Sequence, residues 1–279
     1  MRLLLSSLAA AALLSSALPL SAAGTTKSAA GAAKSTAAHL TDAEAHRGAE
    51  ALKTLPRLVR EAFIAEKLGL LFKPDGSPAY SGALSSTKGN NQHYFIVYEG
   101  AQFVSSEGEL HDYHAEMAKL TSKKHNTALD KVKKAIASAG EDAVFSAFSK
   151  EKDALCLHTA QYWLDSLPAP LREAILADTA GLLFRADGTE VYKGEISSTI
   201  NGSTRPFIIR QMANKVRFID SEGTEQDYSA IIRKSDANKA YLRARQLISW
   251  CVQLSESEAL LALYADTLSA MKQHAQERE

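Results

Sequence analysis

GLLFKPDGSPAYSGALSST, residues 69–87, recurs as GLLFRADGTEVYKGEISST at residues 181–199. The two stretches begin 112 residues apart (181 minus 69) and share a leading glycine, an Asp-Gly pair and an alternation of apolar and polar residues. An alternation with a period of two is typical of strands, and Asp-Gly between two strands is typical of a hairpin turn. The stretch therefore predicts a small β-unit that the chain builds twice.

The similarity continues on both sides of this stretch. Further pairs at the same spacing are His46 with His158, Thr54 with Ser166, Leu55-Pro56 with Leu167-Pro168, and Arg60-Glu61-Ala62 with Arg172-Glu173-Ala174. Apolar residues three and four apart predict a helix with one buried face before each hairpin. Later in the chain, three additional residues at Met212-Ala213-Asn214 shift the spacing to 115 (216 minus 101). Two more strands follow in each copy, and helices close the copies at about 128–149 in the first and 236–254 in the second. We predict an α+β fold with an internal duplication.

Residues 1–23 have the anatomy of a signal peptide, with cleavage after Ala23. Arg2 is followed by an apolar stretch, a helix-breaking Pro19 and the small residues Ser21-Ala22-Ala23. Residues 24–40 are low in complexity and poor in large apolar side chains, which is typical of a flexible linker. The capping box Thr41-Asp-Ala-Glu44 predicts the first helix, so we expect repeat domain 1 at 41–150 and repeat domain 2 at 151–279.

The charge balance excludes several classes of partner. The 279 residues contain 32 Lys plus Arg and 32 Asp plus Glu, so no net field attracts nucleic acid or, after signal cleavage, a membrane surface. The sequence contains no phosphate loop, dinucleotide fingerprint or HExxH pair, and we predict neither a cofactor nor a metal.

One segment of the second copy resembles a known module. Its residues Lys215-Val216-Arg217-Phe218, Glu222-Gly223, Ser235-Asp236 and Tyr241-Leu242 follow the order of the Sla-type homology domain, and Phe103 and Glu107-Gly108 follow it in the first copy. This domain is a small SH3-like barrel of fungal endocytic adaptors and of secreted planctomycete and verrucomicrobial proteins. The resemblance implies that each copy has a helical hairpin, then a small antiparallel SH3-like barrel or sheet, then helices. It also implies a binding module without catalytic machinery.

Aromatic residues on the predicted strands are the candidate ligand contacts, since aromatics on small barrels often form recognition surfaces. They are Tyr80, Tyr192, Tyr113 and Tyr228. Packing in the core is the alternative for Tyr80 and Tyr192.

The remaining chemistry-bearing residues each have a simpler reading. Cys156 and Cys251 either form a disulfide, which an exported chain permits, or remain two free buried thiols. His111 and His114, with His93, could bind a cation, but a polar loop explains them better because the second copy has other residue types at these positions. The repeated Arg60-Glu61 and Arg172-Glu173 are typical of a solvated helix face.

The sequence thus predicts an exported, secreted or periplasmic, non-enzymatic protein that binds a protein, a peptide or an envelope polymer. Two alternatives stay open. One is a hydrolase acting in the cleft between the copies, for which His111, His114, Cys156 and His158 are the unusual residues. The other is a structural component of the envelope or surface.

Overall fold

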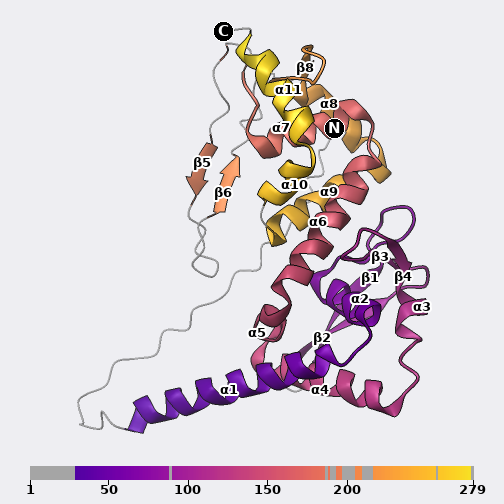
Figure 1. The fold of residues 1–279 in the computed structure, drawn as a ribbon, viewed down its shortest axis with the longest axis vertical. Coiled ribbons are helices and arrows are strands. Elements are labelled where there is room, and N and C mark those ends of the chain that lie inside the picture. The colour runs from indigo at the N-terminus through magenta and orange to yellow at the C-terminus, as the bar shows by residue number, and fades with distance from the viewer. Residues whose placement is uncertain are drawn as a thin grey trace, which may run out of the picture. The chain divides into compact units, whose positions relative to one another are not determined.

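The computed structural model describes residues 29–87, 90–185, 188, 193–196, 205–208, 216–255 and 257–277 (Figure 1). The predicted signal peptide, its cleavage point at Ala23 and the candidate residue Tyr192 lie outside these ranges. The chain divides into two compact units, Met1–Leu40 and Thr41–Glu279, and both hydrophobic cores lie in the second unit. The predicted division of residues 41–279 at residue 150 stays a prediction.

The described elements form runs of helices separated by two runs of short strands. The first half contains α1 (Ala29–Lys53), α2 (Arg57–Leu68), β1 (Tyr80–Thr87), β2 (Asn90–Val97), β3 (Gln102–Val104), β4 (Leu110–Asp112), α3 (Tyr113–Met117), α4 (Lys123–Ala139), α5 (Glu141–Phe145) and the 3₁₀ helix η1 (Ser146–Phe148). The second half contains α6 (Ser149–Asp165), α7 (Ala169–Ala180), β5 (Lys193–Ile196), β6 (Arg205–Ile208), β7 (Arg217–Ile219), β8 (Glu225–Asp227), α8 (Tyr228–Asp236), α9 (Lys239–Leu254), α10 (Ser257–Leu263) and α11 (Ala265–Gln276). The fold is mixed α+β, as predicted, and it is mostly helical.

The strands pair as antiparallel hairpins. β1 pairs with β2 so that Tyr80 lies opposite Val97, and β3–β4, β5–β6 and β7–β8 form three further pairs. A single bridge from Phe72 to Gln102 joins the segment before β1 to β3, and a second from Phe72 to Pro78 closes that segment on itself. Among the described strands each sheet has two members. The SH3-like barrel therefore stays a prediction.

Several predicted helix ends are confirmed and two are wrong. Gly69 and Gly181 end α2 and α7 in the left-handed conformation, as their sequence context predicts. α1 begins at Ala29 rather than at Thr41, because an alanine-rich segment has a high helix propensity and the T-x-x-E box lies inside the helix. A single helix over 128–149 was predicted, but Gly140 (φ 89°) ends α4 and separates it from α5 and η1.

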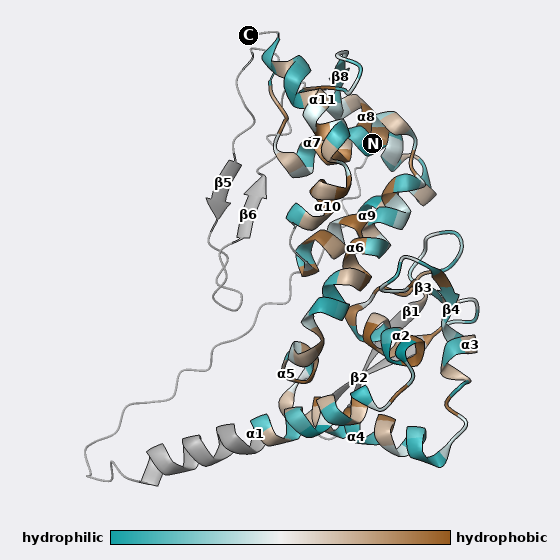
Figure 2. Cartoon of the chain, viewed as in Figure 1, coloured by the Kyte–Doolittle hydropathy of each residue, from teal (hydrophilic) through white to brown (hydrophobic). Residues whose placement is uncertain are grey.

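Two hydrophobic clusters stabilise the fold, and α6 contributes to both. Leu155 and Cys156 of α6 pack in the first cluster with residues of α1, α2 and α4, whereas Trp163 and Leu164 pack in the second. Each cluster also takes residues from the opposite half, for example Cys251 in the first and Phe72 in the second. Figure 2 shows the hydrophobic and hydrophilic residues alternating along these helices, as expected when one face is buried. The two halves are therefore packed through a shared interior.

Glu141, the first residue of α5, should make stability depend on pH. Burial raises the pKa of its carboxyl, Asp142 and Glu66 raise it further, and Lys67 opposes them. A carboxyl with a higher pKa in the folded state binds its proton more tightly when folded, so stability falls as pH rises through that pKa. We expect Glu141→Gln to raise the urea midpoint at about pH 7 and to leave it unchanged at about pH 3, where both states are protonated. A lower midpoint at neutral pH would contradict this assignment.

Candidate functional site

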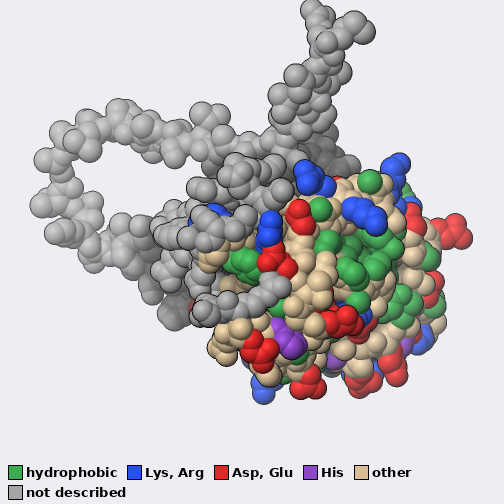
Figure 3. Space-filling view, turned by 90° about the horizontal axis from the view of Figure 1, so that it is seen from above, with side chains coloured by type: hydrophobic (Ala, Val, Ile, Leu, Met, Phe, Trp, Pro, Cys, Tyr) green, Lys and Arg blue, Asp and Glu red, His purple; other side chains and the backbone are tan. Residues whose placement is uncertain are grey.

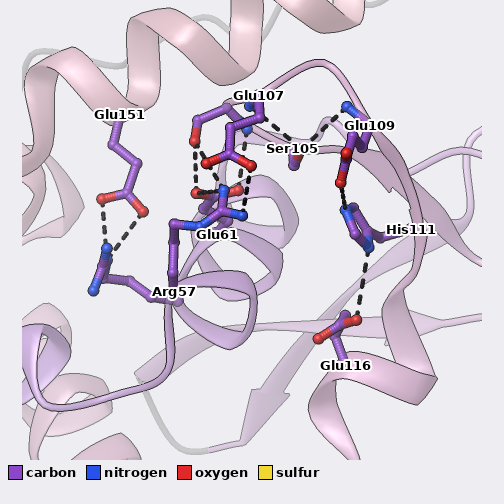
Figure 4. Close-up of polar contacts among 10 residues, drawn as sticks. Arg57, Glu61, Ser105, Glu107, Glu109, His111, Glu116 and Glu151 are labelled. Atoms are coloured by element: carbon purple, nitrogen blue, oxygen red, sulfur yellow. Dashed lines mark hydrogen bonds and ion pairs between the residues drawn. The ribbon is translucent and has the colours of Figure 1, made fainter.

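A polar network fixes the turn between β3 and β4 (Figure 4). The carboxylate of Glu61 on α2 is fully buried and accepts hydrogen bonds from the backbone N–H of Ser106 (3.0 Å), from the Ser106 hydroxyl (2.6 Å) and from Arg57 (3.0 Å). Arg57 also pairs with the exposed Glu107 at 2.9 Å. Beside it, Arg60 donates to both oxygens of Glu151 on α6 at 3.0 Å. Every one of these carboxylates is occupied by donors, so the network is suited to holding the turn rather than to catalysis.

The second half contains matching contacts. Glu173 on α7 accepts from the backbone N–H of Ser221 (3.0 Å) and from its hydroxyl (2.8 Å), as Glu61 does from Ser106. The predicted solvated helix face is therefore wrong for Glu61 and Glu173, because their carboxylates bond the facing turn. The sequence of the helix could not indicate this contact, because the turn residue Ser106 lies 45 positions away from Glu61 in the chain.

Two of the tyrosines chosen from the sequence lie in the interior. Tyr113 and Tyr228 are 7% and 4% exposed. The Tyr113 hydroxyl donates to Glu66 at 2.5 Å, and that of Tyr228 donates to Asp178. Burial and the facing carboxylate raise the pKa of Tyr113. These rings leave little surface for a ligand.

Tyr80 opens β1 opposite Val97, and Tyr192 lies outside the described residues. Their role as ligand contacts stays a prediction.

The unusual histidines are dispersed. His111 lies between Glu109 and Glu116, with nitrogen to oxygen distances of 3.5 and 3.7 Å, and stacks on Phe103. His114 contacts the carbonyl of Tyr98 at 3.0 Å instead. Within the part of the chain that the structure describes, no group of three or more His, Cys, Asp or Glu is placed to hold a metal ion.

The cysteines are inert thiols. Cys156 and Cys251 are both free and buried in the first cluster. Burial raises the pKa of Cys156 to about 12, and burial together with the neighbouring Cys156 raises that of Cys251. Since the thiolate is the nucleophile, neither cysteine is suited to covalent chemistry. His158, two residues from Cys156, faces Gln161, with Nδ1 3.3 Å from its side-chain oxygen.

A groove between the halves is the candidate binding site. It has a volume of about 280 Å³ and lies between the segment that precedes β1 and helix α9. Its lining residues are Gly69, Leu71, Phe72, Gly76, Pro78, Arg243, Gln246, Leu247 and Trp250. The first five belong to the stretch 69–87, and the last four belong to α9.

Contacts across the groove fix its geometry. Asp75 pairs with Arg243 at 2.7 Å, and the indole N–H of Trp250 donates to the carbonyl of Leu68 at 2.8 Å. Hydrogen bonds from the hydroxyl and the backbone N–H of Ser77, with Arg243 nearby, lower the pKa of Asp75 to about 2. The Asp75 carboxylate therefore keeps its charge, and its ion pair with Arg243 on α9, well into the acidic range.

The Asp-Gly turn needs its glycine for two reasons. Gly76 has φ 77°, a left-handed conformation that favours glycine. A Cβ atom at this position would lie 3.0 Å from the ring of Trp163 on α6. The turn, α6 and α9 are therefore in close contact.

The groove suits noncovalent recognition. Pro78, Leu247 and Trp250 give it apolar surface, with Trp250 42% exposed, and Gln246 offers an exposed amide, whereas Phe72 lies beneath as a buried residue. Ligand sites commonly combine apolar walls with a few polar groups that fix orientation. The α9 residues carry no mark of this site in the sequence, because an amphipathic helix does not reveal which segment it packs against. The repeated stretch 69–87 is the one sequence feature that points to this groove.

No family model matches the chain, and comparisons with curated proteins and with solved structures find no match. Among the described helices, none has the length and apolar character needed to span a bilayer.

Proposed function

We propose that this chain is an exported, non-enzymatic binding protein made of two duplicated SH3-like modules, and that it recognises a short peptide segment of a partner in the groove between them. The single observation that carries the proposal is the groove itself, which has a volume of about 280 Å³ and an exposed tryptophan among its lining residues. Tryptophan is among the residues most enriched at binding hot spots. Export is proposed from the signal-peptide pattern of residues 1–23.

The duplication is supported by contacts that recur at the sequence spacing. Besides the two Glu–Ser contacts, Asp112 and Asp227 each cap the helix that follows, by accepting from the N–H of Ala115 and of Ala230. The groove is not duplicated in the same way, since it is formed where the first copy meets α9 of the second. We therefore propose one principal site per chain.

The groove residues favour a peptide over a larger polymer surface. The cavity accommodates a few side chains, and its polar groups are one guanidinium paired with Asp75 and one amide. Such a site suits an extended segment with one or two apolar side chains and hydrogen-bonding backbone groups.

Peptide selection tests the proposal. A phage-displayed library of random peptides, selected against the purified chain, should yield apolar-containing peptides whose synthetic forms bind in calorimetry. Trp250→Ala should weaken that binding about 30-fold, because truncating a tryptophan hot spot costs about 2 kcal/mol.

Leu110→Ala is the matched control. Leu110 on β4 is also 42% exposed, but it does not line the groove. We expect this change to leave the affinity within twofold of that of the wild type. Equal affinity of the Trp250→Ala variant and the wild-type protein, both folded by circular dichroism, would remove the groove as the site.

A further inference from the structure

A second groove lies between the end of α1 and helix α4, away from the groove described above. It has a volume of about 450 Å³ and is open on one side. Its lining residues are Ala51, Thr54, Lys123, Lys124, Thr127, Ala128 and Lys131. Ala51 and Ala128 belong to the buried cluster below, and three of the seven lining residues are lysines.

The positive charge of α4 is not neutralised by neighbours. The helix carries five lysines, at positions 123, 124, 131, 133 and 134, and a single acidic residue, Asp130. None of the five lysines forms an ion pair with a residue that the structure describes, whereas Lys119 pairs with Glu116 and Lys53 with Glu50. The whole chain is neutral, and the face shown in Figure 3 has lysine and arginine interspersed with acidic side chains. The groove is thus a local concentration of one sign of charge.

The spacing of the charges indicates an extended ligand. Lys123 and Lys131 are eight residues apart in one helix, which corresponds to about 12 Å along its axis. Three ammonium groups spread over that length do not converge on one small anion. They suit a polymeric ligand with repeated negative groups, which the lysines would bind through charge and through bridging water molecules.

The residue types that line the groove narrow the chemical class of the ligand. Among the described residues that line this groove none is aromatic, and single-stranded nucleic acids are bound mainly by stacking on aromatic rings in basic channels. Arginine and aromatic residues are enriched in protein interfaces and lysine is depleted, which disfavours a folded protein partner. Lysines above small apolar residues remain suited to a flexible, hydrated polyanion such as an acidic sugar chain.

We propose that the groove between α1 and α4 binds an anionic polysaccharide, whose carboxylate or sulfate groups lie at Lys123, Lys124 and Lys131 and whose sugar rings lie over Ala51 and Ala128. This site does not depend on the peptide groove. The thermodynamic signature is a steep loss of affinity with salt, because each neutralised charge releases counterions.

The test uses a heparin oligosaccharide and polygalacturonate as probes, with dissociation constants measured at low and at high NaCl concentration. Lys123→Gln with Lys131→Gln removes two charges from the groove. Lys133→Gln with Lys134→Gln removes two charges from the same helix outside the lining, and it is the matched control. All four lysines are exposed, so both variants should melt at the wild-type temperature.

The groove variant should bind at least one probe about ten times more weakly than the wild type and reduce its salt slope by about two. The control should change the affinity by less than twofold. The proposal would be overturned by equal losses in both variants, which would indicate net charge alone, or by absence of binding of both probes to the wild-type chain. It would also be overturned by tighter, lysine-dependent binding of a short DNA duplex, which would identify a nucleic-acid site.

Discussion

Phe72→Ala should lower the free energy of unfolding by about 4 kcal/mol, because it empties the interior where the halves meet. Phe72 is 1% exposed and belongs to the second cluster, although it comes from the first half of the chain. Its ring lies edge-on to Trp163 at 5.0 Å between centroids and stacks on Tyr162 at 5.8 Å. Urea unfolding followed by circular dichroism measures the change.

Phe184→Ala is the matched control, since Phe184 occupies the same place in the second repeated stretch. Phe184 is only partly buried, and its backbone pairs with Arg217 as that of Phe72 pairs with Gln102. We expect a loss of about 1 to 2 kcal/mol for Phe184→Ala. Equal losses at the two positions would show that α6 does not cover the first stretch as described.

Glu61→Ala should destabilise the protein by about 3 kcal/mol. The substitution deprives the Ser106 N–H and hydroxyl of their acceptor and leaves a small cavity under the turn. The donors to this carboxylate include the charged Arg57, and hydrogen bonds to charged groups are the stronger ones. The urea midpoint should fall while the slope of the transition stays unchanged.

Glu107→Ala serves as the comparison, because Glu107 binds the same Arg57 from the surface. Its side chain is 60% exposed, and an exposed ion pair contributes less than about 1 kcal/mol. A Glu107→Ala variant as unstable as Glu61→Ala would mean that the arginine, rather than the buried turn, determines the effect.

The parts of the fold that were predictable are those in which the backbone needs a particular residue. Gly69 and Gly181 end helices in a left-handed conformation, and Gly76 turns a hairpin, so each could be read from neighbouring residues alone. The start of α1 was misjudged because the helix propensity of alanine extends the helix beyond a local capping signal. A capping or turn residue therefore predicts the end of a helix or a turn well, provided that the helix propensity of the neighbouring residues does not override it.

The candidate site was less predictable, because its contacts join distant parts of the chain. Trp250 donates to Leu68 across 182 residues, and Arg243 reaches Asp75 across 168. No periodicity in α9 specifies that partner. The same holds for Glu61, whose helix position is compatible with either a solvated or a buried face. The Asp-Gly turn of the repeated stretch is predictable from its own residues. The residues that pack against this turn are not, because they depend on the tertiary structure.

The most direct test of the peptide groove uses the two tryptophans of the chain as reporters. Trp250 lies on the groove, whereas Trp163 is 8% exposed and is not part of its lining. Two-dimensional NMR resolves the two indole N–H signals, which Trp163→Phe assigns. On titration with a library-selected peptide, the Trp250 signal should move to saturation and the Trp163 signal should move much less. Saturable binding with an unmoved Trp250 signal would contradict the proposed site.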